Sequence, residues 1–222
     1  RKDDTRIAPS ITQGDRSPDA EDMINRSLQQ GTLLFNYVGH GGVRGLTAEQ
    51  VITTASISEW TNIRRLPLFV TATCEFSRYD HPTRVSAGEM VFLNPHGGGI
   101  ALLTTTRVVY SSLNFQLNSA FVANVFKEME DGQKPSLGNI IKNTKNAAGN
   151  TVNKLNFSLL GDPALRLIYP SKNIKTATIN QKDVSVSTDT LKALSTARLS
   201  GFVADEGGQP LHSYNGEVEV TV

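Results

Sequence analysis

Two short apolar runs of the chain each lead to a residue that could do chemistry. His40 follows residues Leu33–Val38 by two positions, and Cys74, the only cysteine, follows Leu66–Ala72 by two positions. A thiolate attacks carbonyl carbons, and a nearby imidazole raises the thiolate population and later protonates the leaving amine. If the fold brings the two side chains together, they could cleave a peptide bond through an acyl-thioester.

The runs that precede these residues have the features of buried parallel strands. Both are mostly apolar and lack strict alternation, and the first is flanked by glycine on both sides. A third run of the same kind covers Ile100–Thr104. Ligands of open α/β sheets collect beyond the carboxyl ends of the strands, so His40 and Cys74 are expected at one edge. The third run would add Thr105, Thr106, Arg107 and Tyr110 to that edge, either as a substrate pocket or as a solvated loop.

Plainer interpretations of these residues stay open at this point. A lone cysteine after an apolar strand is often a small buried hydrophobe, and a histidine between glycines is often a turn residue. His81, which precedes Pro82 in a polar loop, could compete with His40 as a base. The excursion over residues 43–62 could form part of a substrate cleft that includes Trp60, although tryptophan is more often a packing residue.

Five ordered stretches of the sequence resemble the gingipain family of cysteine peptidases, within the caspase-like clan. The similarity extends over about residues 15–222 and is greatest to the members that remove C-terminal sorting signals in type IX secretion. The stretches are Asn36–Gly42, Leu66–Arg78, Ser86–Glu89, Gly97–Arg107 and Leu159–Leu165.

This resemblance implies a cysteine endopeptidase or transpeptidase that is exported and associated with the cell surface or outer membrane. Its substrates would be secreted proteins with C-terminal sorting domains, and its partners could include outer-membrane components of the type IX system. His40 and Cys74 would form a catalytic dyad, with the backbone N–H groups of Gly41 and Cys74 as the oxyanion hole. The expected substrate-binding residues are Glu75, Thr106, Arg107 and Tyr110.

The alternative is a peptidase-like module without catalytic activity, used in surface binding or secretion assembly. The clan usually has alanine directly before the cysteine and glycine two places after it, whereas this chain has Thr73 and Phe76. The residues also do not decide between hydrolysis and transfer of the acyl group to an amine, and the group that orients His40 is not identified.

The expected fold has two parts. Residues 1–170 are predicted to form a caspase-like three-layer α/β sandwich with a mostly parallel sheet, and residues 171–222 the start of an immunoglobulin-like β-sandwich. The chain starts at Arg1 without a methionine and stops within an alternating pattern, so the first part is expected to lack upstream residues and the second to be incomplete.

Several elements are predicted from local signals. Ser17-Pro18 predicts a helix start, Ser86–Glu89 a capping box, and the apolar spacing over residues 117–129 a further helix. Residues 43–54 are expected to form a loop with a short helical piece, and Ala164–Tyr169 the last strand of the first part. The β-rich strands are expected at Thr176–Thr188, Ala197–Val203 and Glu217–Val222.

Composition excludes several other classes of function. Lysine and arginine number 22 against 21 aspartates and glutamates, with no basic run, which argues against nucleic acid as a partner. No apolar stretch approaches the roughly 20 residues of a membrane span. Four histidines and one cysteine show no metal-ligand spacing, so neither a metal site nor a cofactor is expected.

Overall fold

The computed structural model describes residues 16–186 and 190–216. The chain divides into two compact units, Arg1–Leu167 and Ile168–Val222. The first unit contains His40, Cys74 and all three apolar runs that were expected to form parallel strands.

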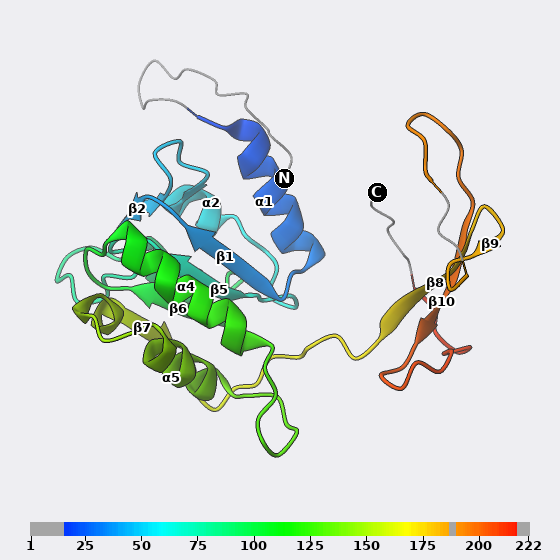
Figure 1. Ribbon diagram of the computed structural model, residues 1–222. Coiled ribbons are helices and arrows are strands. Elements are labelled where there is room, and N and C mark those ends of the chain that lie inside the picture. Colours follow the sequence, from blue (N-terminus) through cyan, green and yellow to red (C-terminus); the bar gives the residue numbers. More distant parts are fainter. Residues whose placement is uncertain (1–15, 187–189, 217–222) are drawn as a thin grey trace. The chain divides into compact units, whose positions relative to one another are not determined.

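A four-stranded sheet forms the middle layer of the first unit, in the order β1-β5-β6-β7 (Figure 1). Strands β1, β5 and β6 run parallel, and β7 pairs antiparallel with β6. The bounds are β1 (Leu34–Val38), β5 (Leu68–Ala72), β6 (Ala101–Thr105) and β7 (Phe157–Leu160). Every residue of β5 and β6 is buried, which explains why these strands are continuous apolar runs. The predicted mostly parallel sheet is confirmed.

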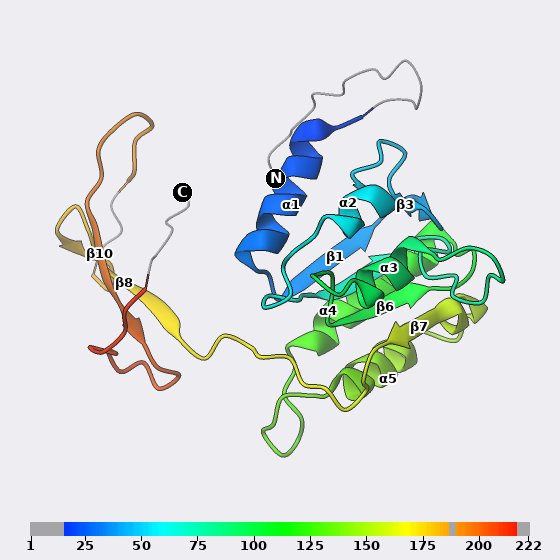
Figure 2. The same cartoon turned by 180° about the vertical axis from the view of Figure 1, so that it is seen from behind.

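Helices cover both faces of the sheet. Helices α4 (Ser111–Val125) and α5 (Leu137–Ala147) lie on one face (Figure 1). Helices α1 (Pro18–Gln30), α2 (Thr54–Ser58) and α3 (Ala87–Leu93) lie on the other (Figure 2). On that side Leu28, Ile57 and Val91 belong to one core cluster with Phe69 of β5. The predicted three-layer α/β sandwich is confirmed.

Local signals at the helix ends behave as expected, with one exception. Ser86 and Glu89 form the predicted capping box of α3. Ser17 occupies the N-cap position of α1 but makes no side-chain cap hydrogen bond there. At the other end of α1, Arg65 donates to the carbonyl oxygens of Gln29 and Gln30. A cation at a helix C-terminus stabilises it because it complements the partial negative charge of the last carbonyl groups.

Trp60 is a packing residue. Its side chain is buried, stacks on Phe69 and donates its indole N–H to Asn25 of α1. The interpretation of Trp60 as part of a cleft is therefore wrong.

Residues 41–53 differ from the expected loop with a helical piece. They form a small antiparallel sheet of three two-residue strands, β2 (Gly41–Gly42), β3 (Gly45–Leu46) and β4 (Ile52–Thr53), and the short helix α2 follows it. A Cβ atom on Gly45 would overlap the carbonyl oxygen of Ile52. Glycine at this position therefore lets two backbones approach too closely for any side chain.

The predicted last strand of the first unit was also misplaced. Residues 164–169 contribute an isolated bridge between Arg166 and Ser136 but no strand of their own. The strand lies earlier, as β7, directly after the 3₁₀ helix η1 (Val152–Asn156). The antiparallel place beside β6 is thus taken by Phe157–Leu160, for which no strand was predicted.

The second unit contains one antiparallel sheet in its described residues. Its order is β10-β8-β9, with β8 (Asn173–Ile179), β9 (Lys182–Asp183) and β10 (Leu199–Ala204). These strands fall within two of the segments predicted to be β-rich, apart from small shifts at the ends, while Glu217–Val222 lies outside the described residues. A sandwich requires two facing sheets, so the immunoglobulin-like fold stays a prediction.

Candidate functional site

Strands β1 and β5 bring His40 and Cys74 to the same edge of the sheet. Val38 is paired with Ala72 at the end of the two strands, and the N–H of Gly39 donates to the carbonyl oxygen of Ala72 at 3.4 Å. His40 and Cys74 each stand two residues beyond this pair. The parallel register therefore places both residues just beyond the carboxyl ends of adjacent strands.

Two hydrogen bonds fix the backbone carbonyl group of His40. Its carbonyl oxygen accepts hydrogen bonds from the Tyr37 hydroxyl at 2.5 Å and from the N–H of Thr47 at 2.9 Å. Burial raises the pKa of the Tyr37 phenol, which keeps that hydroxyl protonated as a donor. His40 is exposed, and its imidazole makes no hydrogen bond within the described part of the chain. No residue described in the structure therefore orients the imidazole by a hydrogen bond.

The N–H of Gly41, one of the two expected oxyanion-hole donors, is not used in the pairing of β2 with β3. In an antiparallel pair, residues that exchange hydrogen bonds alternate with residues that do not. Because the N–H of Thr47 donates to His40, the next opposed pair, Gly41 and Leu46, is of the second kind. The N–H of Gly41 consequently points away from β3.

Gly41 also links the turns that carry the two candidate catalytic residues. A Cβ atom on Gly41 would lie 2.6 Å from Oγ1 of Thr73, the residue before Cys74. The residue after His40 and the residue before Cys74 are therefore packed against each other. A side chain at position 41 would push the two turns apart.

Cys74 is half-buried, and its thiol is turned toward the segment that follows β6. Its Sγ donates to the carbonyl oxygen of Val109 at 3.6 Å. The N–H of the next residue, Glu75, donates to the carbonyl oxygen of Arg107 at 3.3 Å. A thiol in this orientation must leave Val109 before it can attack a substrate carbonyl.

Behind Cys74, buried polar side chains fix the end of β5. Asn114 of α4 donates to the carbonyl oxygen of Ala72, and Asn153 donates to Asn114. Asn153 also accepts the N–H of Tyr110 at 2.9 Å. Sequence reasoning missed both asparagines. Asn114 could have been recognised, because it lies three residues before Leu117 on the otherwise apolar face of α4.

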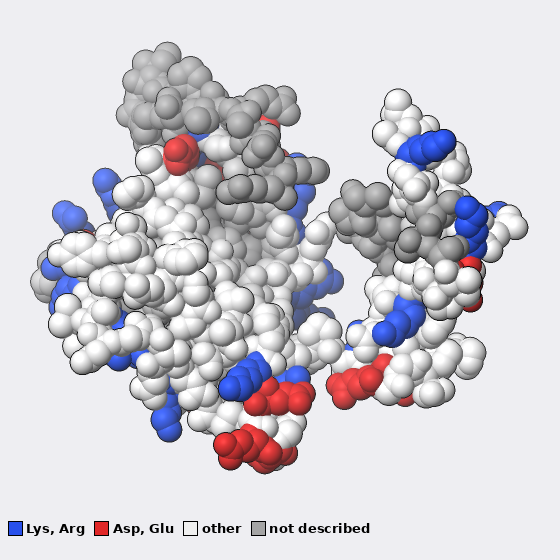
Figure 3. Space-filling view, viewed as in Figure 1, with Lys and Arg blue, Asp and Glu red and all other residues white. Residues whose placement is uncertain are grey.

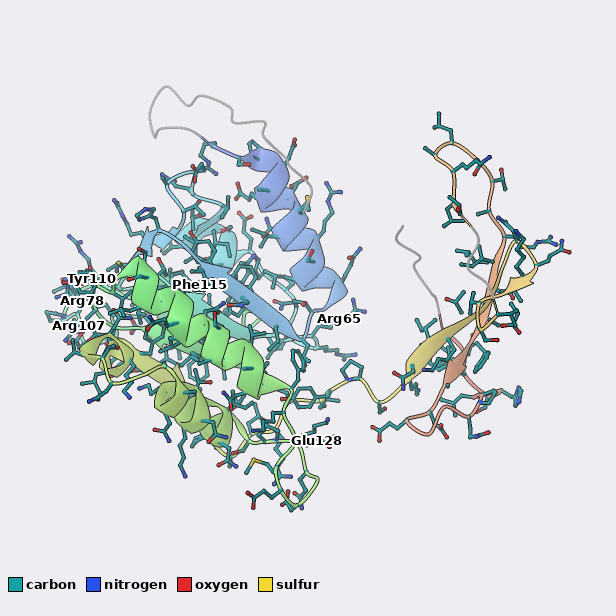
Figure 4. All side chains as sticks on the ribbon, viewed as in Figure 1. Arg65, Arg78, Arg107, Tyr110, Phe115 and Glu128 are labelled. Atoms are coloured by element: carbon teal, nitrogen blue, oxygen red, sulfur yellow. The ribbon has the colours of Figure 1, made fainter. Side chains whose placement is uncertain are left out.

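The four predicted substrate-binding residues also lie at this edge, but most are already engaged. Glu75 pairs with Arg78, and Arg107 pairs with Asp80. The hydroxyl of Thr106 donates to the carbonyl oxygen of Asn156. Figure 4 shows Arg78, Arg107 and Tyr110 together at one end of the unit. The side chain of Tyr110 is 68% exposed and is the most open of the four to a ligand.

A cavity of about 1090 Å³ opens beside His40. Its walls are residues 40–48, 50 and 52–54 of the small sheet and its turns, together with Arg84 from the loop before α3. Cys74 does not line it. The sequence left open whether the residues after His40 form part of a substrate cleft, and the cavity lies among the first of them.

Charged groups elsewhere on this unit are dispersed. Figure 3 shows a largely uncharged face over α4 and α5, with lysines and arginines around its rim and an acidic group near Glu128, after α4. In residues 16–186 and 190–216, no three His, Cys, Asp or Glu side chains are grouped so that they could hold a metal ion. Within the same residues, no helix has the length and apolar character needed to span a bilayer.

Solved structures of cysteine peptidases share this fold. The crystal structure of the Arg-specific cysteine proteinase gingipain R (RgpB) matches with a TM-score of 0.58 at 18% identity, over 70% of this chain and 39% of that chain. The complex of the Porphyromonas gingivalis RgpB pro- and mature domains matches with a TM-score of 0.59 at 16% identity, over 70% and 40%. A structure described as a protease matches with a TM-score of 0.52 at 16% identity, over 82% and 48%.

The sequence comparisons give the family. The chain spans less than half the length of these solved structures. No curated protein sequence matches it. Residues 3–168 match peptidase family C25, which is more than half of the chain. With the caspase-like α/β fold, this match shows that the chain belongs to peptidase family C25, a family of cysteine peptidases.

Proposed function

We propose that this protein is a cysteine endopeptidase in which His40 and Cys74 form the catalytic dyad. The observation that carries the proposal is the parallel register of β1 and β5, which pairs Val38 with Ala72 and sets both residues two positions beyond that pair. The packing of Gly41 against Thr73 supports it, because it holds the two turns together.

In this mechanism Cys74 attacks the scissile carbonyl carbon as a thiolate. His40 takes the thiol proton and then gives it to the leaving amine, so the C–N bond breaks and an acyl-thioester remains. The N–H groups of Gly41 and Cys74 donate to the oxyanion that forms on the carbonyl oxygen. Each such donor lowers the barrier by about 3 to 4 kcal/mol in enzymes where one has been removed.

The proposed substrates are secreted proteins with C-terminal sorting domains, cut at the cell surface. This part rests on the five sequence stretches that resemble PorU, the peptidase of the type IX secretion system. It implies an exported protein associated with the outer membrane, with type IX components as partners. The acyl-thioester can be resolved by water or by an amine, so the same site would serve hydrolysis or transfer.

The test uses cargo with an intact C-terminal sorting domain. The protein and its Cys74→Ala and His40→Ala variants are incubated with this cargo, and release of the sorting domain is followed by intact mass. We expect release by the unchanged protein only. An added amine acceptor distinguishes the two outcomes, because transfer increases the product mass by the acceptor less one water relative to hydrolysis.

Two histidines serve as controls in this experiment. His96 precedes β6, at the opposite edge of the sheet, so His96→Ala should cleave normally. His81 is the competing base, and its Nδ1 accepts the N–H of Thr83. Loss of cleavage in His81→Ala together with full cleavage in His40→Ala would move the role of base to His81. Equal cleavage by Cys74→Ala would refute the nucleophile.

A second candidate function is a peptidase-like binding module without activity. The features that favour it are Thr73 and Phe76 in place of the usual alanine and glycine, and the thiol hydrogen bond to Val109. A catalytic Cys74 should be alkylated by iodoacetamide in the folded protein at neutral pH, whereas an inert thiol reacts only after unfolding. An inert thiol and no cleavage of cargo would favour the module.

A further inference from the structure

Two glycines in the wall of the cavity beside His40, Gly45 and Gly42, have different roles. A Cβ atom on Gly45 would overlap Ile52, so that glycine is required by the packing of β3 against β4. Gly42 differs, because a Cβ atom there would meet nothing within 4 Å and its φ is not positive. The fold does not require glycine at position 42, and its missing side chain leaves part of the cavity open.

The charged groups that line this cavity are both cations. Arg44 lies at the turn between β2 and β3, and Arg84 lies in the loop before α3. The two segments are joined by a hydrogen bond from the N–H of Ala87 to the carbonyl oxygen of Val43 at 2.7 Å. Figure 2 shows β3 and the loop before α3 at the same end of this unit.

Neither guanidinium is paired with a carboxylate of residues 16–186 or 190–216. In the described part of the chain, Arg44 and Arg84 make no ion pair and no side-chain hydrogen bond, whereas Arg78 and Arg107 are paired with carboxylates. Glu49, the acidic residue nearest to Arg44 in sequence, is not part of the cavity wall. Asp80, the one nearest to Arg84, is paired with Arg107. Two unpaired cations among the lining residues therefore favour binding of an anionic group.

The chemistry of the dyad indicates which part of a substrate reaches this site. His40 must stand next to the nitrogen of the scissile bond in order to protonate it. The cavity includes His40 in its wall but not Cys74, so it leads away from the acyl side. Its volume of about 1090 Å³ is slightly above the roughly 300–1,000 Å³ of ligand pockets, which leaves room for several residues of extended peptide.

We infer that this cavity is a subsite for the leaving segment of the substrate and that Arg44 and Arg84 select an aspartate or glutamate there. The acidic residue stands within the first four positions after the cleaved bond, since each extended residue spans about 3.3 to 3.6 Å. The buried side chains of Leu46 and Ile52 add apolar surface to the cavity wall. This inference rests on the proposed function, because it takes His40 as the residue that faces the leaving nitrogen.

The test measures binding, so it does not depend on cleavage. Labelled hexapeptides with a free amino terminus carry glutamate, glutamine or lysine at one of positions 1–4, and their affinity for the Cys74→Ala protein is measured by fluorescence anisotropy. At one position at least, glutamate should bind about five- to tenfold more tightly than glutamine. The difference should shrink at 0.5 M salt, because salt screens exposed charges.

Three variants locate the effect. Arg44→Glu/Arg84→Glu should abolish the preference for glutamate and favour lysine at the same position. Arg64→Glu is the matched control, because Arg64 is exposed, lies before β5 at the opposite edge and has no ion pair in the described residues. Gly42→Val should weaken binding of every peptide at unchanged melting temperature, since its side chain enters open space.

The outcomes separate this inference from the proposed function. Equal affinity for glutamate and glutamine at all four positions, no measurable binding, or a preference that survives Arg44→Glu/Arg84→Glu would overturn the subsite. The dyad is judged independently by release of the sorting domain in the active protein. In that protein, Glu→Gln at the identified position of the cargo should lower kcat/KM about five- to tenfold, with the same dependence on Arg44 and Arg84.

Discussion

A non-glycine residue in the left-handed region stands directly after the candidate nucleophile. Glu75 has a φ of 50°, a conformation that costs about 1 to 2 kcal/mol for a residue with a side chain. Two contacts hold it there, namely the N–H bond to Arg107 and the ion pair with Arg78. Strained backbone of this kind concentrates at functional sites, and here it turns the chain directly after Cys74.

The ion pair between Asp80 and Arg107 predicts how stability depends on pH. Hydrogen bonding to Arg107, which donates from Nη1 to Oδ1 at 3.0 Å, lowers the pKa of Asp80 from its ordinary 3.8. A carboxylate whose folded pKa is depressed stabilises the fold above its unfolded pKa, and this contribution is lost as the pH falls through the folded pKa. Arg107→Gln should therefore raise the pKa of Asp80 and make stability less dependent on pH below about 4.

An NMR titration of the side-chain carboxyl groups checks this expectation. Asp183 is the internal control, since hydrogen bonds from Ser185 lower its pKa and Arg107 takes no part. The midpoint of Asp80 should rise in Arg107→Gln while that of Asp183 stays constant. An unchanged Asp80 midpoint would show that the ion pair does not persist in solution.

Residue positions could be predicted from the sequence where they follow directly from strand ends. His40, Cys74 and Arg107 belong to this group, because each stands just beyond a recognisable apolar run. Arg44 and Arg84 could not be predicted, since their shared cavity depends on how the small sheet packs beside α3. Asn114 was missed because its partner, the carbonyl oxygen of Ala72, is 42 residues away in sequence.

At the level of elements, the buried parallel strands were the predictable part. β5 and β6 are covered on both faces, so burial imposes an uninterrupted apolar run that can be recognised without the fold. Strands β2, β3 and β4 have two residues each, too few for any periodic pattern. The edge strand was misplaced because both Phe157–Leu160 and residues 164–169 have strand-like composition, and pairing with β6 selects between them.

The capping box of α3 predicts how much Ser86 contributes to stability. The Ser86 hydroxyl accepts the N–H of Glu89, while the Glu89 carboxylate accepts the Ser86 N–H at 2.8 Å. Ser86→Ala should lower the free energy of unfolding by about 1 kcal/mol, because an N–H group at the helix start loses its acceptor. Chemical denaturation at pH 7 measures the change.

Two variants control for other effects of this substitution. Ser112 is exposed in the first turn of α4 and makes no side-chain hydrogen bond in the described structure, so Ser112→Ala should change stability by less than about 0.5 kcal/mol. Glu89→Gln keeps an acceptor for the Ser86 N–H and should cost less than Ser86→Ala. An equal effect of Ser86→Ala and Ser112→Ala would contradict a role for the cap in solution.

At the scale of the whole molecule, the two units differ in how much core they bury. The first has cores on both faces of its sheet, with β5 and β6 fully buried. In the second, the first four residues of β8 and of β10 are exposed. A small sheet with little buried apolar surface has little to offset the entropy of ordering its chain.

We therefore expect the described sheet of the second unit to open more readily than that of the first. In native-state hydrogen exchange followed by mass spectrometry, peptides from β8 and β10 should exchange at least about tenfold faster than peptides from β5 and β6, a difference of roughly 1.4 kcal/mol in opening free energy. The physical reason is that β5 is flanked by β1 and β6 and covered by helices, so its amides exchange only when the first unit unfolds. Peptides from the edge strand β1 serve as an internal reference with intermediate protection. Equal protection of β8 and β5 would mean that both sheets unfold in one cooperative step, which would contradict two separately stabilised units.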